Sequence, residues 1–223
     1  MHSKAYNAIW NRITAGWFAN DLASAIIHLL THITSNQPDA RHIIRWPASC
    51  AAQNWDKILA YALQLFIQKS PAITTITHRY WEPGHSTIQN VDKLHSNIEG
   101  GLKHTEMHSP VTLVKLLCKI TPQGQPIYIH QMKAAEFFDY YALATDGIGF
   151  DSARFSTMRE TAYTSASIKD VTVKQQRFGD PQTYIVLQTH HTLSRLIKPL
   201  QKRSHARIGL QPWHKKVARN WIP

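Results

Sequence analysis

Cysteines and long apolar runs are scarce in this sequence. Only two cysteines occur in the 223 residues, far apart at positions 50 and 118, which excludes a disulfide-stapled secreted domain. No apolar run approaches the roughly 18 residues of a membrane span, and residues 1–15 lack the apolar core of a signal peptide. We therefore expect a soluble intracellular protein, nuclear or cytoplasmic, with no membrane partner.

Common sequence motifs are missing as well. The chain has no phosphate-binding loop, no G-x-G-x-x-G, no H-E-x-x-H and no paired C-x-x-C, which excludes the usual nucleotide, protease and zinc interpretations from pattern alone. The lack of heptads, together with 11 prolines and nine glycines, excludes a coiled coil. With 43% hydrophobic and 17% charged residues, the chain can still bury a core of ordinary size.

Positive charge is in excess. Lys and Arg number 25 against 14 Asp and Glu, a formal net charge of +11, and Asp180 is the last acidic residue. After it come eight basic residues: Arg195, Lys198, Lys202, Arg203, Arg207, Lys215, Lys216 and Arg219. A segment of this kind suits phosphate backbones, so these eight are the candidate nucleic-acid-binding residues. The alternative is a solvated basic tail without a specific partner.

Hydrophobic periodicity predicts alternating helices and strands. Helices are expected over 18–34, 54–69, 87–99 and 110–119, and strands over 41–46 and 73–81. Further elements follow: a strand over 126–130, a helix over 131–144, a polar loop over 145–160, and strands near 167–175 and 183–189. Helix, strand, helix, strand, helix over residues 18–100 is the alternation of an α/β layer fold.

Residues 82–99, E-P-G-H-S-T-I-Q-N-V-D-K-L-H-S-N-I-E, are the richest in reactive side chains. On a helix over 87–99, Asp92, His95 and Glu99 share one face, and His85 precedes that helix. Two carboxylates and two imidazoles that converge there could bind a divalent metal or transfer protons. Spacing alone favours the alternative, an exposed helix face whose acidic side chains pair with neighbouring lysines.

The same stretch resembles a segment of a transposon-derived family that is abundant in arthropod and other animal genomes. That segment reads x-E-P-G-H-T, then D-S-V-H-x-x-I-E, and the matching residues are Glu82, Pro83, Gly84, His85, Asp92, His95, Ile98 and Glu99. Cys50, Ala51, Gln53 and Asn54 are similar to its D-N-C-A-G-Q-N signature. An upstream block matches at Trp10, Ala15, Asn20, Asp21 and Ser24, and a weaker one at Tyr128, Met132, Phe137 and Phe138.

The resemblance implies the RNase H-like fold of DDE-type transposases, in which carboxylates hold two Mg²⁺ or Mn²⁺ ions for attack on a phosphodiester. The fold class expected is α/β, an incomplete RNase H-like core with a mixed sheet and flanking helices, plus a small basic C-terminal α+β region. Residues 1–120 would form the truncated core, 121–180 an accessory strand-helix-strand region, and 181–223 the basic segment.

Departures from the family pattern predict lost catalysis. Ala48 stands where the signature has its aspartate, and an alanine methyl cannot coordinate a metal. The first strand of the fold, with its aspartate, is also expected to be missing. Asp92 and Glu99 remain as candidate ligands for Mg²⁺ or Mn²⁺, and two carboxylates on one helix do not make a two-metal clamp.

Three hypotheses therefore stay open at the level of sequence. The first is a transposase-derived, catalytically inactive protein that retains electrostatic nucleic-acid binding. The second is a metal-dependent phosphodiester-cleaving enzyme that uses Asp92, Glu99, His85 and His95. The third is a product of a decayed element without function. Because an incomplete sheet exposes an unpaired edge, self-association or pairing with a related transposase chain is also expected.

Overall fold

The computed structural model describes residues 5–11, 13–16, 18–46, 57–80, 90–106, 109–120, 127–141, 158–175 and 180–185. Its helices are α1 (Ala19–Asn36), α3 (Lys57–Lys69), α4 (Asn90–Lys103) and α5 (Pro110–Lys119), with a 3₁₀ helix η2 (Ala134–Glu136). Its strands are β1 (Ala5–Ile9), β2 (His42–Arg45), β3 (Thr75–Arg79), β4 (Ile127–Gln131), β5 (Glu160–Thr164), β6 (Ser167–Lys174) and β7 (Gln182–Ile185). None of these helices is both long and apolar enough to span a membrane.

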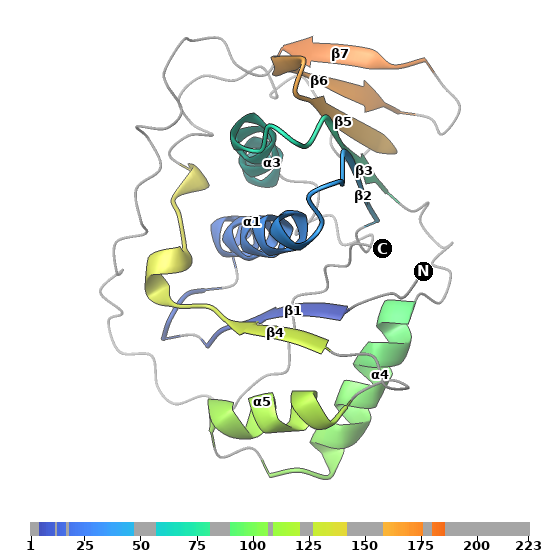
Figure 1. Ribbon diagram of the computed structural model, residues 1–223. Helices are drawn as coiled ribbons and strands as arrows, with labels where there is room; N and C mark the ends of the chain where they lie inside the picture. Colours follow the sequence, from blue (N-terminus) through green and yellow to red (C-terminus); the bar gives the residue numbers. More distant parts are fainter. Residues whose placement is uncertain are drawn as a thin grey trace.

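The strands form two separate sheets. The larger is a mixed five-stranded sheet of order β2-β3-β5-β6-β7, in which β2 and β3 are parallel and the other neighbours are antiparallel. The smaller is a parallel pair of β1 and β4. Figure 1 shows α3 beside the larger sheet, α1 between α3 and the β1–β4 pair, and α4 with α5 beyond that pair. The α/β class with a mixed sheet and flanking helices is confirmed.

One face of the larger sheet carries the main core. Alternate residues of each strand point to the same side, and the register aligns Ile43, Ile76, Tyr163 and Val171 in one buried row. Helix α3 packs into the same core with residues Ile58 to Ile67 all buried, so this helix is enclosed nearly all round. Its strongly apolar sequence follows from that position.

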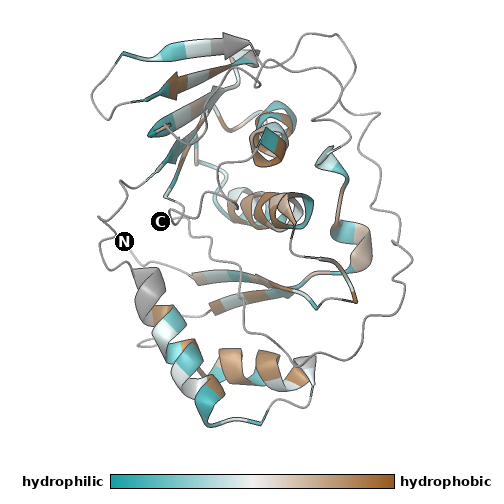
Figure 2. Ribbon diagram, turned by 180° about the vertical axis from the view of Figure 1, so that it is seen from behind, coloured by the Kyte–Doolittle hydropathy of each residue, from teal (hydrophilic) through white to brown (hydrophobic). Residues whose placement is uncertain are grey.

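The β1–β4 pair is covered on both faces. Tyr6, Ala8 and Trp10 lie in the cluster that also holds Ala25 and Leu29 of α1. On the other face, Ala5 and Ile9 pack with residues of α4 and α5: Leu94, Ile98 and Leu117 are the buried ones. Helix α1 therefore separates two cores, and its amphipathic stripe serves both. Figure 2 shows a larger hydrophilic share on α4 than on α1 or α5, as expected for an outer helix.

Most predicted elements are confirmed, with boundaries shifted by a few residues. The helix predicted over 110–119 is confirmed as α5; Ser109 precedes it as the N-cap, and its hydroxyl accepts the Thr112 N–H at 3.3 Å. The helix predicted over 87–99 extends further, since α4 continues to Lys103. Strands β1 and β5 were not predicted.

The helix predicted over 131–144 is wrong for residues 131–139. There β4 ends at Gln131, and the chain makes the short η2 turn between Met132 and Phe137, both buried. Both side chains belong to the core beside α1. Tertiary burial of two apolar residues five positions apart therefore outweighs the local helical pattern. In each sheet, a strand that precedes residue 120 pairs with one that follows it: β1 with β4, and β3 with β5. Hydrogen bonds therefore connect the expected ranges 1–120 and 121–180.

Candidate functional site

The predicted constellation of residues 82–99 falls largely on α4. This helix turns Leu94 and Ile98 into the core, which leaves Glu99 exposed and His95 half-buried. His85 and the side chain of Asp92 lie outside the described part of the chain. Within that part, Glu99 joins no group of three side chains that could hold a metal. In the described part of the chain, Glu99 therefore has no companion ligands for Mg²⁺ or Mn²⁺.

Two further sequence blocks follow neighbouring strands. Residues 48–54 come after β2 and residues 82–85 come after β3, and both blocks lie outside the described residues. Strands β2 and β3 are adjacent and parallel, so their carboxyl ends share one edge of the larger sheet. Ligand sites of α/β sheets favour this edge. The eight basic residues from Arg195 to Arg219 also lie outside the described residues.

The upstream block, which begins at Trp10, has a structural role. The Trp10 indole donates to the Gly16 carbonyl at 2.8 Å, and the Asp21 carboxylate accepts the Phe18 N–H at 3.0 Å at the start of α1. The Ser24 hydroxyl accepts the Phe138 N–H at 3.0 Å.

Asn20 of the same block binds a segment far away in the sequence. Its side-chain amide donates to the Asp139 carboxylate at 2.9 Å and accepts the Tyr141 N–H at 2.9 Å. The upstream block and the weaker block around Phe138 thus hold each other in place. Their polar residues join the first turns of α1 to the chain that follows η2.

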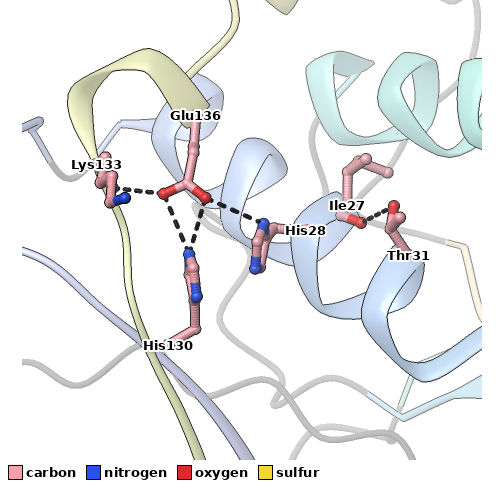
Figure 3. Close-up of polar contacts among 6 residues, drawn as sticks. All are labelled: Ile27, His28, Thr31, His130, Lys133 and Glu136. Atoms are coloured by element: carbon pink, nitrogen blue, oxygen red, sulfur yellow. Dashed lines mark hydrogen bonds and ion pairs between the residues drawn. The ribbon is translucent and has the colours of Figure 1, made fainter. Parts of the chain in front are cut away.

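A different group of side chains comes together between α1 and β4. It consists of His28 of α1, His130 of β4 and Glu136 of η2, and all three are half-buried. Figure 3 shows the Glu136 carboxylate beside both imidazoles, in contact with His130 and with His28. In the described residues this is the one group of three His, Cys, Asp or Glu side chains whose ligand atoms converge, within 4.8 Å of one another.

Each of the three elements positions its residue for a separate reason. His130 shares a face of β4 with Tyr128 and Met132, and this face meets α1 because the opposite face packs on α4 and α5. His28 lies beside Leu29, which packs on the β1–β4 pair. Glu136 is held in place by the Lys133 N–H, which donates to its Oε2 at 2.6 Å.

The distances in this cluster are short. His130 Nε2 lies 2.9 Å from Glu136 Oε1 and 3.1 Å from Oε2, and His28 Nδ1 lies 3.6 Å from Oε1. The two imidazole rings stack with their centroids 3.8 Å apart. One helical turn further on, His32 stacks on Tyr128, also at 3.8 Å. Strand β4 thus places Tyr128 and His130 against two histidines of α1.

Electrostatics favour an ionised carboxylate and a neutral His28. Burial tends to raise the pKa of Glu136, but the hydrogen bonds from Lys133 and His130 and the nearby His28 together bring it below its ordinary value. Burial, and after it the neighbouring His130, lowers the pKa of His28, although Glu136 opposes this shift. The cluster therefore offers a carboxylate oxygen and imidazole nitrogens as electron-pair donors.

The sequence interpretation missed this cluster. His28 and His32 have the i, i+4 spacing that often marks paired ligands on a helix. That signal points to the wrong partner, because His32 stacks on Tyr128 whereas His28 meets His130. The latter pair is separated by 102 residues, and no local pattern connects them.

Comparison of the chain with family models, with curated proteins and with solved structures finds no match.

Proposed function

We propose that this chain is a transposase-derived protein with an RNase H-like ancestry that has lost DDE-type catalysis and binds nucleic acid through its basic segment. The observation that carries the proposal is the distribution of charge. Residues 1–180 contain 17 basic and 14 acidic residues, a net charge of +3, whereas residues 181–223 contain eight basic and none acidic. An all-positive segment releases counterions when it neutralises phosphates, which drives sequence-independent binding.

The loss of catalysis is supported by what stands at the expected metal positions. Ala48 replaces the signature aspartate in the block after β2. Glu99 is exposed on α4, and in the described residues it joins no group of three side chains that could hold a metal. A two-metal mechanism needs several carboxylates around one point. The replacement at Ala48 and the exposure of Glu99 favour binding without cleavage. The resemblance to DNA transposases makes DNA the proposed partner in preference to RNA.

A salt titration of the full chain on a labelled DNA duplex and a single strand tests this proposal. We expect the binding constant to fall steeply with salt, with a slope of about 0.9 per phosphate contacted on the duplex. Replacing Lys215, Lys216 and Arg219 with Gln should reduce that slope by up to about 2.7.

A matched control removes the same charge elsewhere. Lys103, Lys115 and Lys119 of α4 and α5 are exposed, so their replacement with Gln lowers the net charge by three without altering the basic segment. We expect the control to keep most of the wild-type slope. Equal weakening by both triple variants would show that net charge alone governs binding, and a flat salt dependence would exclude the proposal.

The same gels, run with Mn²⁺, test the alternative enzyme. Metal-dependent cleavage that disappears in Asp92→Ala would establish a phosphodiesterase centred on α4, against our proposal. Salt-sensitive binding with intact DNA supports the inactive binder. Absence of binding at 50 mM salt would leave the decayed-element hypothesis.

A further inference from the structure

The His28–His130–Glu136 cluster has the donor set and the spacing of a transition-metal site, and this feature is independent of nucleic-acid binding. We propose that these three residues bind one Zn²⁺ ion. Zinc takes imidazole nitrogen and carboxylate oxygen at about 2.0–2.2 Å, which places neighbouring donor atoms about 3.3–3.5 Å apart in a tetrahedral site. The distances of 2.9 Å and 3.6 Å from Glu136 Oε1 to the two imidazole nitrogens bracket that spacing.

The donor atoms select the class of metal. Two nitrogens and one oxygen suit Zn²⁺ and its transition-metal neighbours, whereas Mg²⁺ prefers a shell of oxygens and water. This site therefore differs in chemistry from the Mg²⁺ or Mn²⁺ site that the transposase resemblance implies. It also lies between α1, β4 and η2, away from helix α4.

The scaffold around the cluster is already organised. The Lys133 N–H holds Glu136 Oε2, so Oε1 stays directed toward His28 and His130. Strand β4 keeps its register through pairing with β1, in which His130 lies opposite Ala8. Hydrogen bonds and packing contacts that surrounding groups make with the ligands orient those ligands and raise the metal affinity of a site. The two rings stack at an interplanar angle of 22°, and the lone pair of an imidazole nitrogen lies in the ring plane, so binding of the ion also requires one ring to tilt out of the stack.

Metal binding must displace a proton. The ionised Glu136 only accepts hydrogen bonds, so His130 Nε2 is the donor in the 2.9 Å contact. When Zn²⁺ binds, this proton leaves Nε2: it moves to Nδ1 by a change of tautomer, or to solvent from the doubly protonated ring. The Nε2 lone pair then coordinates the ion, and the three side chains, each about a quarter exposed, leave the fourth position open to water.

A stability measurement can distinguish this site from the other histidines, because its ligands lie far apart in the chain. Fourteen histidines occur in the sequence, and flexible ones can bind Zn²⁺ in folded and unfolded chains alike. His28 and His130, 102 residues apart, meet only in the folded state. An ion bound between them therefore stabilises the fold, and the thermal midpoint rises with Zn²⁺ concentration.

The experiment measures the thermal midpoint of the full chain against Zn²⁺ concentration, with Mg²⁺ as the comparison ion. Glu136→Gln keeps an oxygen that can accept the Lys133 N–H, and His130→Gln removes the central imidazole. His32→Gln is the matched control, since this residue lies one turn along α1 and outside the ligand set. Co²⁺ in place of Zn²⁺ gives a second readout, because its visible absorption reports bound nitrogen and oxygen ligands.

We expect Zn²⁺ to raise the wild-type midpoint by several degrees, and Mg²⁺ to leave it unchanged. The shift and the Co²⁺ band should persist in His32→Gln and weaken at least tenfold in apparent affinity in Glu136→Gln and His130→Gln. No shift in the wild type, or equal shifts in all variants, would overturn the proposal. Loss of the shift in His32→Gln alone would overturn the assignment of the ligands. If His130→Gln fails to fold, Glu136→Gln decides.

Discussion

Burial of His78 makes the free energy of unfolding depend on pH. This side chain is 1% exposed on β3, and the register places it beside Arg45 of β2 and Thr161 of β5. Its ring stacks on Tyr80 with centroids 4.5 Å apart. Burial, and after it the positive charge of Arg45, holds the pKa of His78 well below its ordinary value. The folded chain therefore disfavours the protonated form of His78.

The size of the effect follows from proton linkage. The unfolded chain takes up a proton on His78 near pH 6.5 and the folded chain does not, so the free energy of unfolding falls as the pH falls through that value. For a histidine that stays neutral when folded, the loss between pH 7.5 and pH 5.0 is about 2 kcal/mol. This contribution is fully retained above about pH 7.5.

Urea unfolding of wild type and His78→Phe at the two pH values measures this quantity. Phenylalanine keeps a flat ring against Tyr80, and no hydrogen bond is lost at His78 Nε2, which has none in the described residues. Any packing cost of about 1–3 kcal/mol applies at both pH values and cancels in the comparison. We expect the wild type to lose about 2 kcal/mol more than the variant between pH 7.5 and 5.0.

A control variant, His104→Gln, removes an exposed imidazole that follows α4 and should keep the wild-type pH dependence. Equal losses in wild type and His78→Phe would refute the reasoning, because His78 would then take up its proton in the folded chain. A loss in the wild type that is smaller than the variant's would reverse the predicted sign.

Two further predictions concern α4 and the edge of the larger sheet. Gly100→Ala should stabilise the chain by about 0.5–1 kcal/mol in urea unfolding, since a Cβ there meets open space. Gly101→Ala should lose that gain, because its Cβ would lie 3.0 Å from Ile120 and 3.1 Å from Leu116 of the α5 region. Equal effects on stability at both glycines would contradict this packing. In the described residues β2 pairs with β3 alone and exposes Ile44. Ile44→Lys should therefore reduce self-association, measured by sedimentation. It should change the free energy of unfolding by less than about 0.5 kcal/mol. A wild type that sediments as a monodisperse monomer at high concentration would contradict the edge argument.

The elements that the sequence predicts well are those with one strong local signal. Helix α1 has an apolar stripe at helical spacing, and α5 has Ser109-Pro110 at its start. Strand β6 combines β-branched residues with alternation. Strand β1, A-Y-N-A-I, escaped prediction because helices cover both of its faces, so four of its five residues are buried and no polar alternation is left.

The candidate sites also differ in whether local sequence or long-range packing defines them. The basic segment, and the carboxylates of residues 82–99, can be found from sequence because charge and helical spacing are properties of contiguous residues. The burial of His78 beside Arg45 depends on which strands pair and in which register. So does the inward-facing row of Tyr128 and His130, which requires β4 to pair with β1.

By itself, then, the sequence determined the α/β alternation, most helix positions and the uneven distribution of charge, because each is encoded over a few turns or strand residues. Only the tertiary structure decided that His28 meets His130 rather than His32, and that Glu136 completes the group from a 3₁₀ turn expected to be part of a longer helix. The physical reason is that these contacts arise when α1 packs between two cores. Residues distant in the chain contribute to that packing together, so no short stretch of sequence encodes it.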